Sequence, residues 1–274
     1  MNHKEQIGYL TVACNNERTN YLELAYTQAL CVKKTQENNK FALVVDSVTK
    51  TSVTDKHLKV FDYIIEAPNH NYGPFGTEAF LFELTPFKET IKLESDLLLT
   101  RSIDHWINIF RLKDIVLSTG CRNYKQEKSS VRTYRKTFDD NYLPDIYNGL
   151  MYFRFTKTAK NFFDTVKKIF ADWDIVKTKI KNCREDIPST DLVFAIAAQI
   201  IGREHCTIPS ADFINFVHMK PAINGFDKDL TSSEAFVTEF DNGMIRVNNI
   251  NQYHPFHYFD KDFITKEMID YYEK

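Results

Sequence analysis

The chain has 274 residues, of which 43% are hydrophobic and 26% are charged, as in ordinary globular proteins. With eight glycines and eight prolines it is neither disordered nor collagen-like, and its net charge of −2 gives no global attraction for a polyanion. The five cysteines are scattered without a Cys-x-x-Cys pair, which argues against a zinc cluster or a disulfide framework and fits a reducing cytosol.

The N-terminus lacks the apolar core of a signal peptide. No apolar run approaches the roughly 20 residues that a membrane helix needs. We therefore expect a cytoplasmic protein without membrane contact.

Apolar, strand-like runs alternate with helical patterns in the first half of the chain. Strands are expected at residues 7–14, 41–46, 60–65 and 114–118, and in the run that ends in Glu94-Ser95-Asp96. Helices are expected from Asn20 to Lys34, over residues 76–85, and from Ser102 onward. This alternation predicts a parallel α/β sheet flanked by helices. Ligands of such sheets bind beyond the carboxyl ends of the strands, where the acidic pair is expected.

The second half of the chain is more mixed. Residues 121–140 are predicted to form a polar, charged loop, and the region after His218 to be rich in loops. The elements expected there are a strand over 148–155, a helix that buries Phe162 to Trp173, a helix from Ser189 or Thr190 to Ile201, and a helix from Thr265 to Tyr272. Since no linker is visible, we predict one domain over residues 1–274 with a C-terminal elaboration.

Glu94 and Asp96 are separated by one residue and are followed by three leucines. Two carboxylates at the end of a buried strand are costly unless a positive charge compensates them. The usual compensator is a divalent cation, because Mg²⁺ and Mn²⁺ take hard carboxylate ligands. A metal at a strand end can in turn hold a diphosphate, which points to chemistry on a nucleotide-activated substrate. The alternative is a solvated strand end without a metal.

Four blocks of sequence, in this order, resemble nucleotide-sugar glycosyltransferases of the GT-A architecture, in the style of glycogenin and the bacterial galactosyltransferases. The blocks are the strand Tyr9-Leu10-Thr11-Val12-Ala13, the segment from Thr85 to Asp96, the strand from Tyr147 to Phe153 with Ser189-Thr190-Asp191 downstream, and His218-Met219-Lys220-Pro221. The second block is similar to the segment that leads into the Asp-x-Asp motif of that family. The third is similar to its Asn-Ser-Gly strand.

The resemblance implies a GT-A-like, Rossmann-type, mostly parallel sheet, a UDP-sugar donor and a divalent metal, Mn or Mg. It implies a nucleotide-sugar half up to residue 120 and an acceptor-side half over residues 121–274. The implied contacts are Thr11, Val12, Ala13, Glu94, Ser95, Asp96, Asn148 and Gly149 for the donor, Glu94, Asp96 and His218 for the metal, and Asp191 and Lys220 for catalysis. Because the first acid is Glu94 rather than an aspartate, the metal is expected to rest mainly on Asp96 and His218.

A divalent ion at this place neutralises the departing diphosphate as a Lewis acid, and Lys220 adds a second positive contact. Asp191 is expected near the sugar or the acceptor hydroxyl, as orienter or base. Each residue also has a structural interpretation. His218 and Lys220 are equally explained as surface or hydrogen-bonded residues, and Asp191 by the dipole at a helix start. Asn148 and Gly149 are equally explained by a turn into a strand.

A basic segment over residues 122–136 lies in this nearly neutral chain. Its basic residues are Arg122, Lys125, Lys128, Arg132, Arg135 and Lys136, with Tyr124 and Tyr134 among them and Glu127 as the opposing acid. Basic residues mixed with aromatic ones suit phosphate contacts and base stacking. The alternative is a solvated loop, the usual state of a charge run.

If this segment binds duplex DNA, the chain resembles bacteriophage transferases that glycosylate hydroxymethylcytosine, which must flip the target base, and it acts in the host cytoplasm. Two alternatives stay open. One is the same catalytic core acting on a polysaccharide or a protein. The other is a non-catalytic module that binds a sugar nucleotide or a nucleic acid.

Overall fold

The structure is a computed structural model that describes residues 5–129, 135–211 and 213–274. Its centre is a six-stranded sheet in the order β3-β2-β1-β4-β9-β6. The strands are β1 (Glu5–Val12), β2 (Phe41–Val45), β3 (Tyr63–Glu66), β4 (Phe87–Glu94), β6 (Ile115–Thr119) and β9 (Ile146–Arg154). Strands β1 to β4 run parallel, and β9 lies antiparallel between β4 and β6. The predicted α/β fold with a mostly parallel sheet is confirmed.

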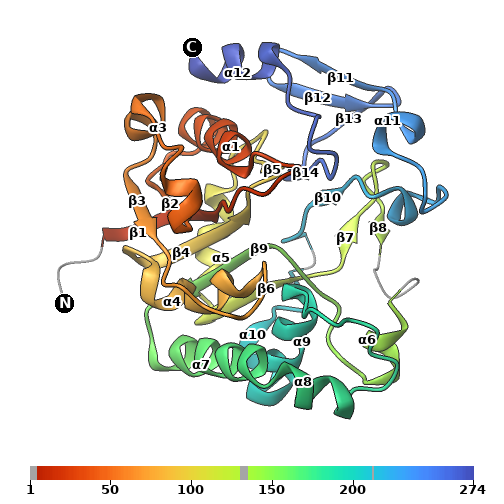
Figure 1. The fold of residues 1–274 in the computed structure, drawn as a ribbon. Helices are drawn as coiled ribbons and strands as arrows, with labels where there is room; N and C mark the ends of the chain where they lie inside the picture. The colour runs from red at the N-terminus through yellow and green to blue at the C-terminus, as the bar shows by residue number, and fades with distance from the viewer. Residues whose placement is uncertain (1–4, 130–134, 212) are drawn as a thin grey trace.

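Helices cover both faces of this sheet (Figure 1). α1 (Tyr21–Thr35) packs on one face, and α7 (Lys157–Ala171) and α9 (Thr190–Ile201) pack on the other. Side chains alternate along β1, so that Tyr9 joins the apolar cluster of α1 and Leu10 joins that of α7 and α9. Strands buried on both faces need apolar residues at nearly every position, which is the pattern that the sequence shows.

The remaining helices are short. They are α2 (Ser47–Lys50), α3 (Asp55–Val60), α4 (Leu81–Leu84), α5 (Ile107–Phe110), α6 (Lys136–Asp140), α8 (Trp173–Val176), α10 (Arg203–Cys206), α11 (Ser232–Ala235) and α12 (Lys266–Glu273). The helix predicted over residues 76–85 is a short 3₁₀ helix, Gly76–Phe80, followed by α4. The predicted last helix is confirmed as α12, which Thr265 caps. None of the helices in the described ranges has the length and apolar character needed to cross a membrane.

A second sheet brings three distant segments together beside the carboxyl end of β4. Its strands, in spatial order, are β5 (Leu97–Leu98), β14 (Phe256–His257), β10 (Val217–His218), β7 (Cys121–Arg122) and β8 (Lys128–Ser129). β14 is antiparallel to β5, with His257 opposite Leu97, and parallel to β10, with His257 opposite His218. The C-terminal part of the chain therefore lies directly against the residues that follow β4.

The region after His218 is more ordered than the sequence analysis predicts. Besides β14 it contains a three-stranded antiparallel sheet of β11 (Thr238–Asp241), β12 (Met244–Val247) and β13 (Ile250–Asn251). Its two hairpins turn through Asn242-Gly243 and Asn248-Asn249, and all four residues have a positive φ, which suits Asn and Gly. These strands escaped prediction because each has at most four residues, too few to show a period.

Candidate active site

The acidic pair lies where β4 leaves the central sheet. Glu94 is the last residue of β4, and Asp96 stands in the tight turn before β5. Gln28 of α1 holds this turn, because its side-chain amide donates to the carbonyl oxygens of Glu94 and Leu97, at 2.5 and 2.6 Å. The backbone on both sides of Asp96 is therefore fixed by the helix that covers the sheet.

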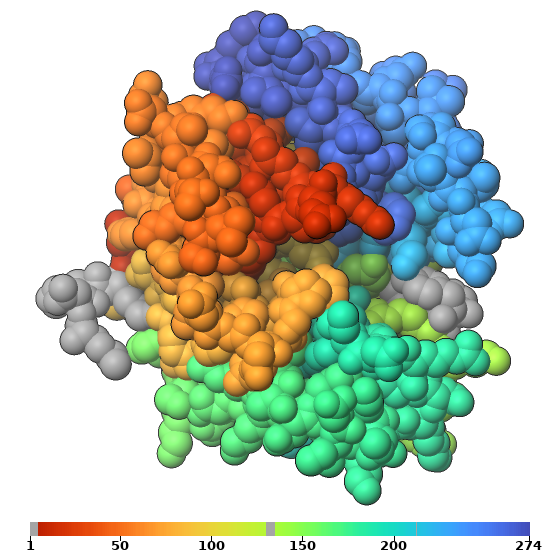
Figure 2. All heavy atoms as spheres, viewed as in Figure 1, coloured from red at the N-terminus to blue at the C-terminus, as the bar shows by residue number. Residues whose placement is uncertain are grey.

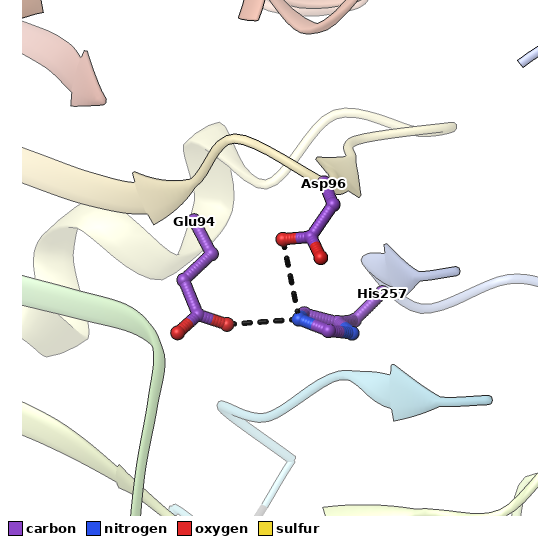
Figure 3. A group of neighbouring side chains, drawn as sticks. All are labelled: Glu94, Asp96 and His257. Atoms are coloured by element: carbon purple, nitrogen blue, oxygen red, sulfur yellow. Dashed lines mark hydrogen bonds and ion pairs between the residues drawn. The ribbon is translucent and has the colours of Figure 1, made fainter. Parts of the chain in front are cut away.

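Figure 3 shows His257 pointing from β14 at both acids. Its Nε2 atom lies 2.8 Å from Glu94 Oε2 and 3.3 Å from Asp96 Oδ1. The other oxygen of Asp96, Oδ2, forms an ion pair with the ammonium of Lys261. The positive charge that the acids require thus comes from two residues of the C-terminal segment.

These contacts set the charge of the cluster. Burial alone would raise the pKa of Asp96, but the charges of His257 and Lys261 outweigh it and hold that pKa well below its ordinary value. Burial alone would lower the pKa of His257, but Asp96 and Glu94 raise it to about 10. At neutral pH two carboxylates therefore face an imidazolium and an ammonium.

His218, which the sequence predicts as a metal ligand, has other partners. Its Nε2 is hydrogen-bonded to the hydroxyl of Tyr147, and its Nδ1 accepts from the backbone N–H of Lys220 at 3.2 Å. Burial, followed by the charge of His257, lowers the pKa of His218 well below its ordinary value, so its ring is neutral. Within the described residues, the potential ligand atoms that lie within 4.8 Å of one another belong to Glu94, Asp96 and His257. His257, rather than His218, is therefore the histidine whose ring nitrogen contacts the acidic pair.

A second charge pair joins Lys92 of β4 to Glu78 of the 3₁₀ helix. Lys92 Nζ lies 2.8 Å from Glu78 Oε1 and donates to the carbonyl oxygen of Asn148 at 3.0 Å. The side-chain amide of Asn148 donates to the other oxygen of Glu78. The Lys92 side chain is 1% exposed. This pair was not predicted from the sequence, where its signal is one lysine inside an apolar strand. His257 and Lys261 were not predicted either, and their signal is a histidine followed four residues later by a lysine.

Asp191 and Asn148, both predicted as site residues, lie together. Asp191 Oδ1 accepts from the backbone N–H of Asn148 at 2.7 Å, and its Oδ2 accepts from Arg135 at 2.9 Å. Burial raises the pKa of Asp191 against the opposing charge of Arg135, and the negative charge of Glu94 adds to the rise. Arg135, predicted as a DNA contact, is engaged inside the protein, with 13% of its side chain exposed.

These groups line a cleft of about 790 Å³, a volume typical of ligand sites. Figure 2 shows the hollow near the centre of the molecule, where the red and orange N-terminal segments, the teal segment and the blue C-terminal segment meet. The predicted residues that line it are Val12, Glu94, Ser95, Asp96, Asp191 and His218. The unpredicted charged residues that line it are Asp46, Glu78, Lys92, His257 and Lys261. Segments far apart in sequence therefore build one site.

The other predicted residues lie outside the lining of the cleft in the described part of the chain. The hydroxyl of Thr11 and the backbone N–H of Ala13 donate to carbonyl oxygens of neighbouring strands, at 3.0 and 2.9 Å. A Cβ atom on Gly149 would lie 2.5 Å from the ring of Phe216, so the glycine is needed for that ring to pack on β9. Lys220 holds its ammonium 5.9 Å from the ring centre of Phe259.

The basic segment divides into engaged and exposed residues. Arg122 donates to a side-chain amide and to a backbone carbonyl of its own neighbourhood, at 3.0 and 2.7 Å. Lys125, Lys128 and Lys136 are exposed. Arg132 lies outside the described residues. The surface charge of this segment is therefore smaller than its composition indicates.

No protein-family model matches the sequence, and a comparison with characterised proteins gives no match. Similar solved structures include apo xyloside xylosyltransferase 1 of mouse, with 12% identity over 74% of this chain and 84% of the other and a TM-score of 0.47. The glycosyltransferase GlyE of Streptococcus pneumoniae TIGR4 has 10% identity over 75% of this chain, which spans 46% of GlyE, with a TM-score of 0.46. The 4-diphosphocytidyl-2C-methyl-D-erythritol synthase of Anaerococcus prevotii DSM 20548 has 11% identity over 78% of this chain and 87% of the other, with a TM-score of 0.42. Similarity at this level assigns no activity, and the residues of the cleft carry the functional inference.

We predict that His257→Gln costs more stability in mildly acidic than in alkaline solution. The pKa of His257 rises on folding from 6.5 to about 10, so its stabilising contribution is complete below 6.5 and is lost as the pH climbs through 10. Urea unfolding of the variant and the parent protein at about pH 6 and about pH 9.5 measures the difference. The exposed His205→Gln is the control, and an equal cost of His257→Gln at both pH values would contradict the assignment.

Proposed function

We propose that the chain is a glycosyltransferase that moves a sugar from a UDP-sugar to a hydroxyl acceptor with the help of Mn²⁺ or Mg²⁺. The observation that carries this proposal is the meeting of Glu94, Asp96, His257 and Lys261 in one cleft at the end of β4. Clefts at the carboxyl ends of parallel strands are the usual ligand sites of such sheets. Two acids beside two cations form a place where a metal and a diphosphate can exchange with existing ion pairs.

The donor set fits a divalent metal. Two carboxylates and an imidazole suit Mn²⁺, and neighbouring ligands in an octahedral shell lie about 3 Å apart. The distances of 2.8 and 3.3 Å from His257 Nε2 to the two carboxylates agree with that spacing. We therefore propose Glu94, Asp96 and His257 as the ligands, with His257 in place of His218. When bound, the metal supplies Lewis-acid neutralisation of the departing diphosphate.

Lys261 takes the role that the sequence analysis gave to Lys220. Its ammonium is already in the cleft and paired with Asp96, whereas Lys220 lies outside the lining. In the proposal Lys261 moves from Asp96 to a phosphate oxygen and stabilises the charge that develops there. Asp191 orients a hydroxyl of the sugar or the acceptor, or serves as its base, because its carboxylate reaches the cleft and is held by two hydrogen bonds.

Of the proposed donor contacts, Val12 and Ser95 line the cleft and are suited to touch the nucleotide. Thr11 and Ala13 fix the end of β1 beneath it through their hydrogen bonds. Asn148 donates hydrogen bonds to Glu78 and Asp191 and so positions both carboxyl groups. The nucleotide half of the chain thus supplies one wall, and the C-terminal segment supplies the other.

Exchanging each histidine in turn tests the metal assignment. We expect His257→Gln and Asp96→Asn to weaken Mn²⁺ binding by more than about 100-fold, since losing a metal ligand costs more affinity than losing a residue that only supports a ligand. His218→Gln should change it less than about tenfold. Calorimetric titration with Mn²⁺ alone measures this without an acceptor. Loss of Mn²⁺ binding in His218→Gln, with retention in His257→Gln, would contradict the proposal.

For the acceptor we propose hydroxymethylated cytosine in duplex DNA, as in a bacteriophage modification enzyme. Support comes from the exposure of Lys125, Lys128 and Lys136, because exposed basic side chains suit phosphate contacts. Arg122 and Arg135 are less suited to this role, because their guanidinium groups already donate to residues of this chain. A polysaccharide or protein acceptor is the alternative, and a non-catalytic binding module is the third candidate.

The exposed lysines provide the test of the DNA acceptor. Lys125→Glu/Lys128→Glu/Lys136→Glu should weaken binding to a short duplex at low salt and flatten its dependence on salt, because each lost phosphate contact lowers the salt slope by about 0.9. Fluorescence anisotropy at several salt concentrations measures both quantities. The control is Lys157→Glu/Lys160→Glu/Lys168→Glu on α7, an equal charge change on another surface. If the parent protein and the triple variant bind the duplex with equal affinity, DNA is not the acceptor.

A further inference from the structure

We infer that Glu78, held by Lys92 and Asn148, is the residue that selects the donor sugar, and that the sugar is neutral with free hydroxyl groups. This inference rests on the proposed function, since it concerns the sugar end of the same cleft. Glu78 lines the cleft together with Asp191 and the metal-binding acids. The roles assigned above give it no direct contact with the donor or the metal.

The hydrogen bonds of Glu78 leave room for a ligand. Oε1 accepts from Lys92 and Oε2 accepts from the amide of Asn148. A carboxylate has about four acceptor positions, so each oxygen can accept a further hydrogen bond, and Glu78 belongs to the lining of the cleft. A carboxylate with two fixed donors behind it and open positions in front is suited to accept from neighbouring hydroxyls of a sugar ring.

The ammonium of Lys92 holds Glu78 and also donates to the carbonyl oxygen of Asn148. Lys92 sits in the middle of β4 with a side chain that is 1% exposed, and a hydrophobic side chain would fill that position without a desolvation cost. A buried ion pair is weak evidence of stability, because a well-packed apolar pair is often as stable. The pair therefore indicates a need for a fixed carboxylate in the cleft.

Two residues of this region carry polar atoms without partners among the described residues. Asn148 Oδ1 and Ser189 Oγ are buried without a hydrogen-bond partner among the described residues. Asn148 is bonded to both Glu78 and Asp191, and Ser189 lines the cleft two residues before Asp191. Buried polar atoms without partners are costly. Ser189 belongs to the lining, so a hydroxyl-rich ring in the cleft, whose groups both donate and accept, is suited to the hydroxyl of Ser189.

The charge balance favours a neutral sugar over a uronic acid. Glu78 is balanced by Lys92, and Asp191 by Arg135, so that these cations are already committed. Both carboxyls line the same cleft as Glu94 and Asp46. A carboxylate on the sugar would meet this negative surface without a counter-ion of its own.

Calorimetric titrations of UDP, UDP-glucose, UDP-galactose and UDP-glucuronic acid in the presence of Mn²⁺ test the inference. The parent protein should bind at least one neutral UDP-hexose more tightly than UDP-glucuronic acid. Glu78→Gln should weaken binding of that hexose donor about tenfold or more, the effect of losing a charged hydrogen-bond acceptor. Its affinity for UDP alone should stay within about twofold. The rate of donor hydrolysis should fall with the affinity.

Since Glu78→Gln leaves the Lys92 ammonium buried without its partner, a second variant guards against misfolding. Glu78→Gln/Lys92→Met removes both charges and should keep the parent melting temperature and UDP affinity while losing the sugar preference. Glu83→Gln is the matched control, because Glu83 pairs with Lys167 on the surface outside the cleft.

If folded variants bind UDP as the parent does and rank the sugars in the parent order, Glu78 is not the selecting residue, and the proposed glycosyltransferase function stands. Tightest binding of UDP-glucuronic acid by the parent would overturn the neutral-sugar assignment. If the parent binds none of the four compounds, the proposed function fails and this inference fails with it.

Discussion

The ion-paired cluster at the end of β4 is the constraint on which the rest of the structure depends. Asp96 is buried and Glu94 is partly exposed to the cleft. Taking a carboxylate out of water costs several kcal/mol unless a cation compensates it. His257 and Lys261 provide that compensation, and β14, which carries His257, lies between β5 and β10 in the second sheet. The site is therefore complete only when the two ends of the chain have folded against each other.

The cleft has two regions with different electrostatic designs. Near Asp96 the cations are His257 and Lys261, which in the proposal are exchanged for a metal and a phosphate. Near Glu78 and Asp191 the cations are structural partners, fixed in β4 and beside α6. The first arrangement suits a leaving group whose charge changes during reaction. The second suits a neutral ring that must be oriented and distinguished from similar rings.

Local patterns in the sequence were sufficient for the central sheet and for its acidic strand end, because apolar runs and their boundaries are properties of adjacent residues. They were insufficient for the partners of that strand end. His257 and Glu94 are 163 residues apart, and the segment that carries His257 has no period to place it. The predicted histidine, His218, lies opposite His257 in the neighbouring strand. Arg135 shows the same limit, since its bond to Asp191, 56 residues away, is invisible in a charge count.

The most direct test of the account is a crystal structure of the protein with Mn²⁺ and UDP-glucose, recorded with anomalous scattering from manganese. We predict one manganese peak in contact with Glu94, Asp96 and His257, bridging to the diphosphate, and the Lys261 ammonium on a phosphate oxygen instead of on Asp96. A nucleotide bound while Asp96 stays paired with His257 and Lys261, or a manganese ion bound at His218, would contradict the account.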